Sequence, residues 1–401
     1  MNILVLPAHY YLSDKYGTEP SWGVEIVNRL GEKGHKVFAV AGVAELSKPL
    51  HPNVQLHTLY AGPRSRNTLV ELWRKVRFSL ACWTIGRRIL SQHPIDVIHH
   101  IAPVSPNSFN LLAAFSRSDI PFIMGPAMLP SRTFSRYELA AWLGTKANFL
   151  SQVGEGLLAM SATPCSWLFR RTISNCDRFV CATEGALRYY ERYMDKGRMA
   201  AVPVGIDVGK FHPPSRRERR TLIILAVAYL TRRKGIDLLL KALAQVRITY
   251  PRVRLVVAGD GPERDPLEGL ASQLGLQAVV RFLGHIEHRS IGGYYRKADI
   301  FCSPTLYEPF GQTILEAMAS GLPVVASRVG AIPDLVTEDL GILFTKGDVR
   351  ELAGALETLI GDEQKRVEMG KKARQRAESH YDWSQVVDRY LAIYQSTMRT
   401  A

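Results

Sequence analysis

Residues 307–326 read Tyr-Glu-Pro-Phe-Gly-Gln-Thr-Ile-Leu-Glu-Ala-Met-Ala-Ser-Gly-Leu-Pro-Val-Val-Ala, and the elements expected around this stretch decide the fold. Before it, the apolar run Ile300–Ser303 predicts a short buried strand. Pro304 and Pro309 indicate a loop, because a proline disfavours helical dihedrals in the residue before it. The chain is therefore expected to leave a strand and enter a loop at the start of the quoted stretch.

A short buried helix is expected next. Apolar residues follow Gln312, Gly321 stands where a left-handed C-cap belongs, and Pro323 prevents the helix from continuing. Residues 324–326 predict another strand. Gly311 lies at the N-terminus of this helix, where backbone N–H groups and the positive end of the helix dipole suit a phosphate group.

Two carboxylates, Glu308 in the loop and Glu316 in the helix, are separated by seven residues. A carboxylate in an apolar helix is costly to bury unless it meets solvent or polar partners. The two residues are either exposed side chains of an ordinary loop and helix or members of a binding site. The density of turn and apolar signals around them favours the binding site.

The stretch resembles the donor-binding motif of retaining GT-B glycosyltransferases, and most closely that of glycosyltransferase family 4. That motif has two Glu separated by seven residues, Phe-Gly after the first and Ala-x-Ala-x-Gly-x-Pro-Val after the second, and every element is present here. The resemblance implies that Glu308 faces the donor sugar and that Glu316 holds the ribose hydroxyls of a nucleotide. It also implies that backbone groups line the sugar and the diphosphate, namely those of Phe310, Gly311, Gln312 and Thr313.

The composition is that of a globular protein, and 401 residues are enough for two domains. No apolar run reaches the length of a membrane span, and Met1–Pro7 predicts a first strand in place of a signal peptide. The five cysteines are scattered, without a Cys-x-x-Cys pattern. They are interpreted as reduced core thiols in the cytoplasm, with no metal site.

The net charge of +14 is unevenly distributed. Residues 1–206 hold 23 Lys and Arg against 14 Asp and Glu, a net charge of +9, and the remainder holds 28 against 23, a net charge of +5. A basic protein of this kind fits nucleic acid, anionic lipid or phosphorylated substrates. Since the sequence has no nucleic-acid-binding motif, nucleic acid is not an expected partner.

The chain begins with a predicted βαβ unit: a strand over Asn2–Leu6, a polar loop to Trp22, a helix opened by Gly23, and a second strand over His35–Val40. The unit is similar to the family's opening unit, in which a Gly-rich loop precedes the helix. The resemblance implies that Gly23 lies on the acceptor or phosphate side of the site. An ordinary βα turn without a ligand is the alternative.

Ile95–His100 predicts a strand similar to the family's Asp-Val-Ile-His strand. His99 and His100 then lie at the carboxyl end of a strand, where open α/β sheets bind ligands, and they are candidates for the acceptor or phosphate side. A histidine in this position is also often a packing or hydrogen-bonding residue. A further strand over Pro121–Gly125 ends in Gly-Pro, where many family members carry a histidine near the reacting centre.

Two basic segments rich in aromatic residues, Arg64–Gln92 and Ser131–Arg171, are expected to form helices. The first is amphipathic, with apolar residues at helical spacing: Leu69, Leu72, Trp73, Val76, Leu80 and Trp83. Contact with an anionic membrane surface explains both segments. Packing against the core with a solvated basic face explains them equally well.

The second half of the chain follows the family pattern. Gly205-Ile206-Asp207 resembles the family's interdomain linker, and the domain boundary is placed there. Strands are expected over Leu222–Ala228, Arg254–Gly259 and Val280–Leu283, and the resemblance implies that Gly284 and His285 pass close to the nucleotide base. Residues 347–401 predict helices, and Tyr381-Asp382-Trp383 resembles the signature that precedes the last helix.

Lys234-Gly235 matches the family's Gly-Arg-Leu-x-x-x-Lys-Gly pattern, whose Arg and Lys grip the donor diphosphate. Tyr229 stands where that Arg belongs. Arg232 or Arg233 is therefore the candidate to replace it in donor binding.

The sequence predicts an α/β protein of the GT-B class, with two Rossmann-like domains facing each other across a cleft. Residues 1–205 are expected to bind the acceptor and residues 206–375 the nucleotide sugar, while residues 376–401 form a helix that packs back on the first domain.

The expected reaction moves a hexosyl unit from a nucleotide-diphosphate sugar to an acceptor with retention, without a metal or another cofactor. Glu308 and Lys234 are the candidate catalytic residues. The basic N-terminal half favours a lipid-linked acceptor at the inner face of a membrane, in glycolipid or polysaccharide biosynthesis. The alternatives are a soluble enzyme with a small-molecule acceptor and a GT-B nucleotide-sugar epimerase.

Overall fold

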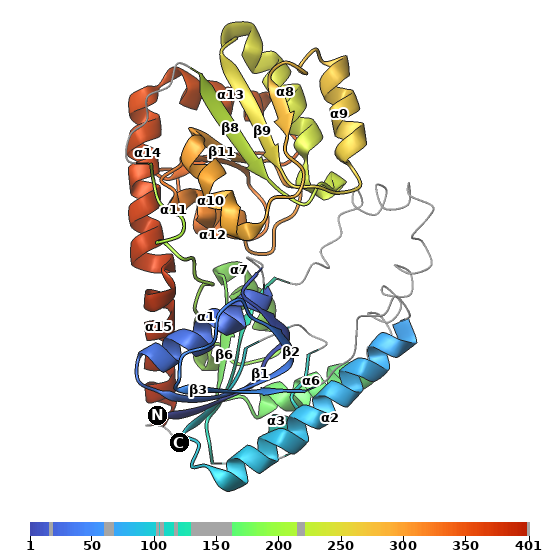
Figure 1. Ribbon diagram of the computed structural model, residues 1–401, viewed down its shortest axis with the longest axis vertical. Helices are drawn as coiled ribbons and strands as arrows, with labels where there is room; N and C mark the ends of the chain where they lie inside the picture. The colour runs from blue at the N-terminus through green and yellow to red at the C-terminus, as the bar shows by residue number, and fades with distance from the viewer. Residues whose placement is uncertain are drawn as a thin grey trace. The chain divides into compact units, whose positions relative to one another are not determined.

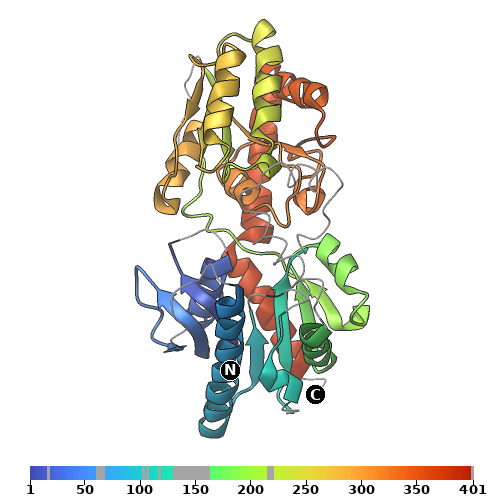
Figure 2. The same ribbon diagram turned by 90° about the vertical axis from the view of Figure 1, so that its right-hand side faces the viewer.

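The structure is a computed structural model that describes residues 1–15, 19–59, 68–101, 104, 108–115, 119–129, 163–214 and 221–398, without the side chains of residues 68–72, 75 and 163–166. The chain divides into two compact units. Unit 1 comprises Met1–Val204 with Trp383–Ala401, and unit 2 comprises Gly205–Asp382. Each unit is a parallel sheet flanked by helices (Figures 1 and 2). Residues 376–382, expected in the C-terminal segment, belong to unit 2.

Unit 1 is built on a seven-stranded parallel sheet with the strand order β3-β2-β1-β4-β5-β6-β7. The strands are β1 (Asn2–Ser13), β2 (Lys36–Glu45), β3 (Val54–Thr58), β4 (Val97–His100), β5 (Phe122–Ala127), β6 (Arg178–Cys181) and β7 (Met199–Ala201). The helices are α1 (Glu19–Glu32), α2 (Thr68–Gln92), α3 (Leu111–Phe115), α6 (Thr163–Ser174), α7 (Glu184–Tyr190), the short η2 (Lys196–Arg198) and the C-terminal α15 (Trp383–Met398).

The first βαβ unit differs from its prediction in the length of its elements. β1 continues through Ser13, with a shift of register against β2 between Val5 and His9, so the polar loop predicted up to Trp22 is wrong. α1 begins at Glu19, and Gly23 therefore lies inside the helix instead of opening it. The strand continues because Leu12 is fully buried in the core of unit 1.

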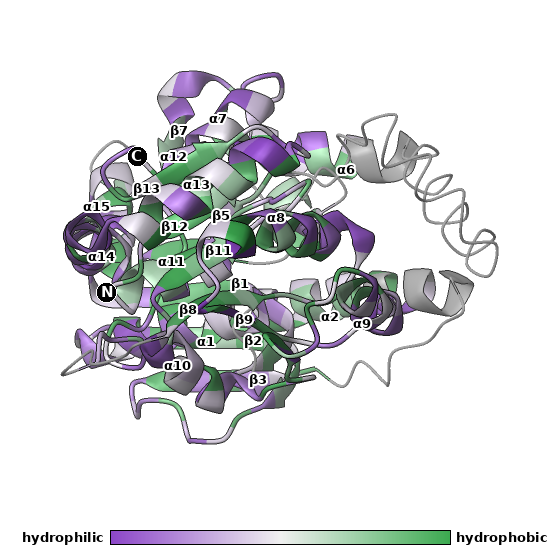
Figure 3. Ribbon diagram, turned by 90° about the horizontal axis from the view of Figure 1, so that it is seen from above, coloured by the Kyte–Doolittle hydropathy of each residue, from purple (hydrophilic) through white to green (hydrophobic). Residues whose placement is uncertain are grey.

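Both faces of the sheet in unit 1 are covered, as parallel sheets require. Alternate residues of a strand point to opposite faces. On one face, Leu4 and Leu6 of β1 pack in a cluster with residues from α2, α3, α6 and α7. On the other, β1 contacts α1, and α1 contacts α15. The strands β1 and β5 are accordingly drawn mostly in green, the colour of apolar residues (Figure 3).

The C-terminal helix α15 is bound to the sheet of unit 1 through buried side chains. The Tyr394 hydroxyl donates to His99 Nδ1 at 2.7 Å, and His99 Nε2 donates to the Gly125 carbonyl at 3.0 Å. The Tyr390 ring lies 5.1 Å from the His99 ring, centroid to centroid. The last helix thus packs on the N-terminal sheet, as the sequence predicts.

Unit 2 is built on a six-stranded parallel sheet with the strand order β10-β9-β8-β11-β12-β13. Its strands are β8 (Leu222–Val227), β9 (Val253–Ala258), β10 (Val280–Phe282), β11 (Ile300–Ser303), β12 (Val324–Ser327) and β13 (Gly341–Phe344). Its helices are η3 (Arg232–Lys234), α8 (Ile236–Thr249), α9 (Arg264–Gln273), α10 (His288–Lys297), α11 (Gln312–Ala319), α12 (Ile332–Leu335), α13 (Val349–Gly361), α14 (Glu363–Arg376) and η4 (Ala377–Tyr381).

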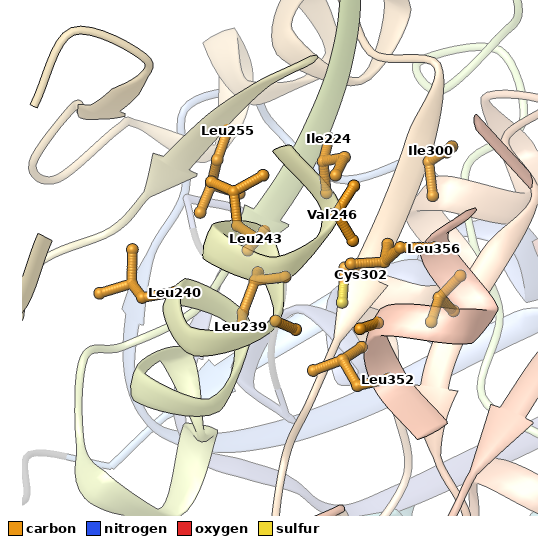
Figure 4. Close-up of a cluster of buried hydrophobic side chains, with 14 of the residues drawn as sticks. Ile224, Leu239, Leu240, Leu243, Val246, Leu255, Ile300, Cys302, Leu352 and Leu356 are labelled. Carbon is orange, nitrogen blue, oxygen red and sulfur yellow. The ribbon is translucent and has the colours of Figure 1, made fainter. Parts of the chain in front are cut away.

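The two faces of this sheet carry different helices. Ile300 and Cys302 of β11 point into a cluster formed with α8, α9 and α13 (Figure 4). Phe301, between them in sequence, points to the opposite face, where its ring lies 5.7 Å from the ring of Tyr295 in α10. α10 and α11 contact each other beside this face.

Four of the cysteines, Cys82, Cys176, Cys181 and Cys302, are free and buried. Burial raises the pKa of the Cys82 thiol to about 12, which makes it unreactive. Among the helices that the structure describes, none has both the length and the apolar character needed to cross a bilayer.

The buried His99 makes the stability of unit 1 depend on pH. Burial lowers the pKa of His99 from 6.5 to about 3, so between these values the unfolded chain binds a proton that the folded protein does not. The free energy of unfolding should fall as the pH is lowered through this window and should be independent of this group above it. We expect a loss of about 2 kcal/mol at pH 5 relative to pH 7.5 from His99.

Urea unfolding at the two pH values measures this loss. The parent should lose about 2 kcal/mol more than His99→Gln, while His212→Gln, at an exposed position, should follow the parent. An identical pH dependence in the parent and His99→Gln would contradict the assignment.

Candidate functional site

The predicted site residues of unit 2 lie where the strand order of its sheet changes direction. β8 and β11 are neighbours in the sheet, although β9 and β10 separate them in sequence. Open α/β sheets bind ligands at the carboxyl ends of strands at such a point. β8 leads into η3, which ends in Lys234, and β11 leads into the loop that carries Glu308.

Lys234 and Glu308 form an ion pair at this point. Lys234 Nζ donates to Glu308 Oε2 at 2.8 Å, and the two side chains are only 17% and 11% exposed. A charge buried to this extent requires a partner, so each side chain compensates the other. An ammonium group has three N–H donors, and this bond uses one of them.

The two segments that carry this pair touch through their backbones. Gly235 has φ 64°, and a Cβ there would lie 2.1 Å from the Pro304 carbonyl oxygen. The Glu308 carbonyl is held in a similar way, because it accepts from Ala331 N at 3.0 Å and a Cβ on Gly330 would lie 2.0 Å from its oxygen. Glycines at these positions allow the close approach.

The two candidate arginines have different partners. Arg233 Nη1 donates to the Tyr307 carbonyl at 2.8 Å, next to Glu308 in sequence. Arg232 Nε donates to Glu263 at 3.3 Å, and the Arg232 side chain is 57% exposed. Arg233 is thus bound to the loop that carries Glu308, and the replacement of the missing arginine by either residue stays a prediction.

Glu316 is buried in α11, with its side chain 4% exposed. Its two oxygens have separate donors: His288 Nε2 donates to Oε1 at 3.1 Å, and the Tyr295 hydroxyl donates to Oε2 at 2.7 Å. Glu316 is therefore a compensated buried carboxylate, and the exposed-helix interpretation is wrong.

The helix predicted after the first carboxylate is confirmed as α11, with Gly311 as its N-cap at φ 104°. Gln312 and Thr313 are the first helical residues, and Gln312 Nε2 donates to the Gly205 carbonyl at 3.4 Å. Phe310 is 3% exposed. The helix N-terminus is therefore placed on the loop that carries Glu308, as the sequence predicts.

Gly284 and His285 follow β10, close to the carboxyl end of β9. Gly259 N donates to the Gly284 carbonyl at 2.8 Å, and Gly284 has φ 71°. His285 is exposed. Their predicted position after a strand is confirmed, and their contact with a base stays a prediction.

Gly23, His99 and His100 belong to unit 1. A Cβ on Gly23 would lie 3.0 Å from the Ala8 carbonyl oxygen, so this glycine lets α1 pack closely on β1. His99 is 0% exposed with both ring nitrogens hydrogen-bonded to protein groups, and His100 is 2% exposed. Their burial favours the packing interpretation of both histidines over contact with a ligand.

Three residues that connect to Glu316 are not among the predicted site residues: His288, Tyr295 and Lys210. A signal was present for the first two, because residues 288, 291 and 295 lie on one face of a helix, and Ile291 is buried there. Lys210 lies in the linker, and its Nζ donates to His288 Nδ1 at 2.7 Å. No local pattern indicates that contact.

The predicted basic helix is confirmed over α2, but of the described side chains of its apolar stripe only Trp83 packs against the core. The core-facing side of α2 is formed by Phe78, Cys82 and Ile89. On the opposite side, Trp73, Val76 and Leu80 are 69%, 36% and 46% exposed. At 100° per residue they share an arc of about 120° with three exposed arginines. We call this the α2 surface: Trp73, Val76, Arg77, Leu80, Arg87 and Arg88.

Some residues of the two predicted basic segments lie outside the described parts of the chain. They are Arg64, Arg66, the side chains of Leu69 and Leu72, and residues 131–162.

Comparison with known proteins gives consistent matches. Two family models match, Glycosyltransferase Family 4 over residues 24–210 and Glycosyl transferases group 1 over residues 207–376. The gpi3 subunit of phosphatidylinositol N-acetylglucosaminyltransferase from Schizosaccharomyces pombe is 25% identical over 401 residues, covering 96% of this chain and 80% of that protein. D-inositol 3-phosphate glycosyltransferase from Corynebacterium urealyticum is 31% identical over 326 residues, covering 71% of this chain and 76% of that protein.

Among solved structures, sucrose-phosphate synthase from Thermosynechococcus elongatus has a TM-score of 0.72 at 20% identity, covering 100% of this chain and 99% of that one. The fold is thus GT-B, and the protein is a glycosyltransferase. The chain belongs to glycosyltransferase family 4, with the group 1 domain in its C-terminal part. The resemblance drawn from the motif around Glu308 and Glu316 is confirmed.

The close approach beside Lys234 predicts an unequal response to two glycine substitutions. Gly235→Ala and Gly347→Ala both place a side chain at positive φ, 64° and 82°, at a cost of roughly 1–2 kcal/mol each. A Cβ on Gly347 meets nothing within 4 Å, whereas one on Gly235 overlaps the Pro304 carbonyl. We expect Gly235→Ala to lower the free energy of unfolding by at least about 1 kcal/mol more, because overlap adds to the strain. Equal losses in chemical denaturation would show that the two loops can separate freely.

Proposed function

We propose that this glycosyltransferase moves a hexosyl unit from a nucleotide-diphosphate sugar to an acceptor, with retention at the anomeric carbon and without a metal ion. One observation carries the proposal: Lys234 and Glu308 meet at 2.8 Å at the carboxyl ends of β8 and β11. A cation and an anion held together there offer one group to the diphosphate and one to the sugar.

The donor diphosphate would bind Lys234 and the N-terminus of α11. The ammonium group keeps N–H donors for phosphate oxygens beyond its bond to Glu308. The start of α11 adds backbone N–H groups and the positive end of the helix dipole. Glu316, in the second turn of the same helix, would accept hydrogen bonds from the ribose hydroxyls.

In the proposed step, the bond between the anomeric carbon and the diphosphate oxygen breaks, and a bond from an acceptor oxygen forms on the same face of the sugar. The acceptor proton passes to an oxygen of the leaving diphosphate. Lys234 stabilises the negative charge that develops on that group, an effect that is large in a site preorganised for it. Glu308 orients the sugar and offsets its developing positive charge.

We propose that the acceptor is lipid-linked and that the α2 surface binds an anionic membrane. Exposed Trp and Leu beside Arg suit a bilayer interface, where a ring and a guanidinium each find a favourable depth. The surface runs along the helix from Trp73 to Arg88, roughly 22 Å at 1.5 Å per residue. The name of the Schizosaccharomyces pombe relative, which refers to phosphatidylinositol, supports a lipid acceptor.

A small-molecule acceptor is the second candidate. The name of the Corynebacterium urealyticum relative refers to D-inositol 3-phosphate, and that protein is 31% identical to this chain. The same donor site serves both candidates, so only the acceptor distinguishes them.

Substitution of Lys234 tests the donor site. We expect Lys234→Ala to lower turnover with the best of a panel of nucleotide sugars by about a hundredfold or more, because the leaving group loses its cation. Lys241→Ala, at an exposed position on α8, should keep the parent rate. Rates are compared at a temperature at which all three proteins are folded. A near-parent rate for Lys234→Ala would remove this assignment, and rapid turnover of donor without any acceptor would indicate an epimerase.

Vesicle binding tests the α2 surface. We expect sedimentation with phosphatidylserine-containing vesicles at low salt, weakened by added salt. Arg87→Gln with Arg88→Gln should weaken binding roughly thirtyfold, at about 1 kcal/mol for each arginine. Arg252→Gln with Arg254→Gln, an exposed pair in unit 2, makes the same charge change and should have little effect. No binding at any salt, together with rapid transfer to a water-soluble acceptor, would support the second candidate.

A further inference from the structure

A chain of hydrogen bonds leads from the linker to the buried carboxylate of Glu316. Lys210 Nζ donates to His288 Nδ1 at 2.7 Å, and His288 Nε2 donates to Glu316 Oε1 at 3.1 Å. From the other side, the Tyr295 hydroxyl donates to Glu316 Oε2 at 2.7 Å. His288 and Tyr295 both come from α10, which contacts α11 (Figure 1).

The partners assign the proton positions along this chain. An ammonium group only donates, so His288 Nδ1 must accept from Lys210, and the ring proton is on Nε2, where a carboxylate accepts it. Burial and the neighbouring carboxylate raise the pKa of Tyr295 well above its usual range. Its hydroxyl therefore keeps its proton and is the donor in the bond to Glu316, while the Thr313 carbonyl, at 3.2 Å, is a longer second acceptor.

The donors are themselves held in place by packing. Phe211, which is 1% exposed, has its ring 5.8 Å from the His288 ring and 5.6 Å from the Tyr295 ring. Arg374 Nη1 donates to the Phe211 carbonyl at 2.6 Å and so fixes this part of the linker on unit 2. The geometry around Glu316 is thus set from outside α11.

The same contacts leave the carboxylate able to bind a ligand. A carboxylate has about four acceptor positions, and His288 and Tyr295 occupy one on each oxygen. One position therefore remains on each oxygen, the number that two vicinal hydroxyl groups need. A carboxylate free to rotate would lose this match. Ordering it on binding would also cost conformational entropy.

We propose that His288 and Tyr295 are positioning residues that fix the carboxylate of Glu316 for the two vicinal hydroxyls of a ribose, and that Lys210 fixes the tautomer of His288. This inference rests on the proposed function, because it takes a nucleotide sugar as the donor. None of His288, Tyr295 and Lys210 is assigned contact with the reacting atoms.

Discrimination between ribose and deoxyribose tests the proposal. Calorimetry measures the affinities of the parent for UDP, GDP and ADP and for their 2′-deoxy counterparts. For the preferred base, the parent should bind the ribose form roughly tenfold to a hundredfold more tightly, as expected for a hydrogen bond to a charged group. Glu316→Ala should abolish this preference.

His288→Ala and Tyr295→Phe should each reduce the preference to about threefold or less, because an oxygen of the carboxylate loses its donor. His288→Gln should retain the parental preference, because its amide N–H replaces Nε2–H. Lys210→Met should have an intermediate effect. His212→Ala, at an exposed histidine of the same unit, is the matched control.

If His288 and Tyr295 had a merely structural role, their substitution would lower the affinities for the ribose and the deoxyribose nucleotide together. The ratio of the two affinities would then stay unchanged. A parental ratio in folded His288→Ala and Tyr295→Phe would therefore overturn the proposal, and Tyr295→Phe alone suffices if His288→Ala does not fold. Failure of the parent to bind any of the nucleotides would count against the proposed function itself. Binding by the parent without a ribose preference would overturn the inference while leaving diphosphate recognition in place.

Discussion

The ion pair between Lys234 and Glu308 is the interaction on which the arrangement of the site depends. Both side chains are mostly removed from water, so neither is stable there without the other. The pair also sets the geometry of the two loops, because it lies within a backbone contact that only glycine permits at position 235. The switch in strand order brings the two loops together, and the ion pair fixes their separation.

Glu316 shows a second way to compensate a buried carboxylate. Glu308 meets a full opposite charge, whereas Glu316 meets a neutral imidazole and a phenol. The cation of Lys210 stands behind the imidazole and does not contact the carboxylate directly. The carboxylates of one loop and the helix that follows it therefore have different environments, which fits the different tasks proposed for Glu308 and Glu316.

Much of unit 2 could be predicted from the sequence, since its strands are short apolar runs and its turns are marked by Gly and Pro. β11 was predicted to the residue and α11 begins close to its expected start, because Pro309 and Gly311 define the loop between them. The first βαβ unit was harder. β1 extends to Ser13 because burial continues beyond Pro7, at Ala8, His9, Leu12 and Ser13, and a polar-looking sequence concealed it.

The parts of the site that could not be predicted are those made by contacts between distant residues. The pairing of Lys234 with Glu308 spans 74 positions, and the contact of Lys210 with His288 spans 78. Local periodicity carries no information on such contacts. It also could not show that Trp73 and Leu80 point away from the core, since Phe78 and Cys82 offer α2 an equally apolar alternative face.

The bond between Tyr394 and His99 closes a loop of 295 residues, and this has a consequence for how the protein is made. Unit 2 is continuous in sequence, so it can complete its fold as soon as its own residues leave the ribosome. Unit 1 is completed only by α15, which follows unit 2 in the sequence, and this reverses the usual N-terminal-first order of folding. Until α15 has been synthesised, the apolar surface beside His99 stays uncovered. Closing so long a loop by diffusion would cost about 2 kcal/mol more than a loop a tenth as long. A folded unit 2 shortens the effective separation, so the second unit to be translated acts as the scaffold on which the first is finished.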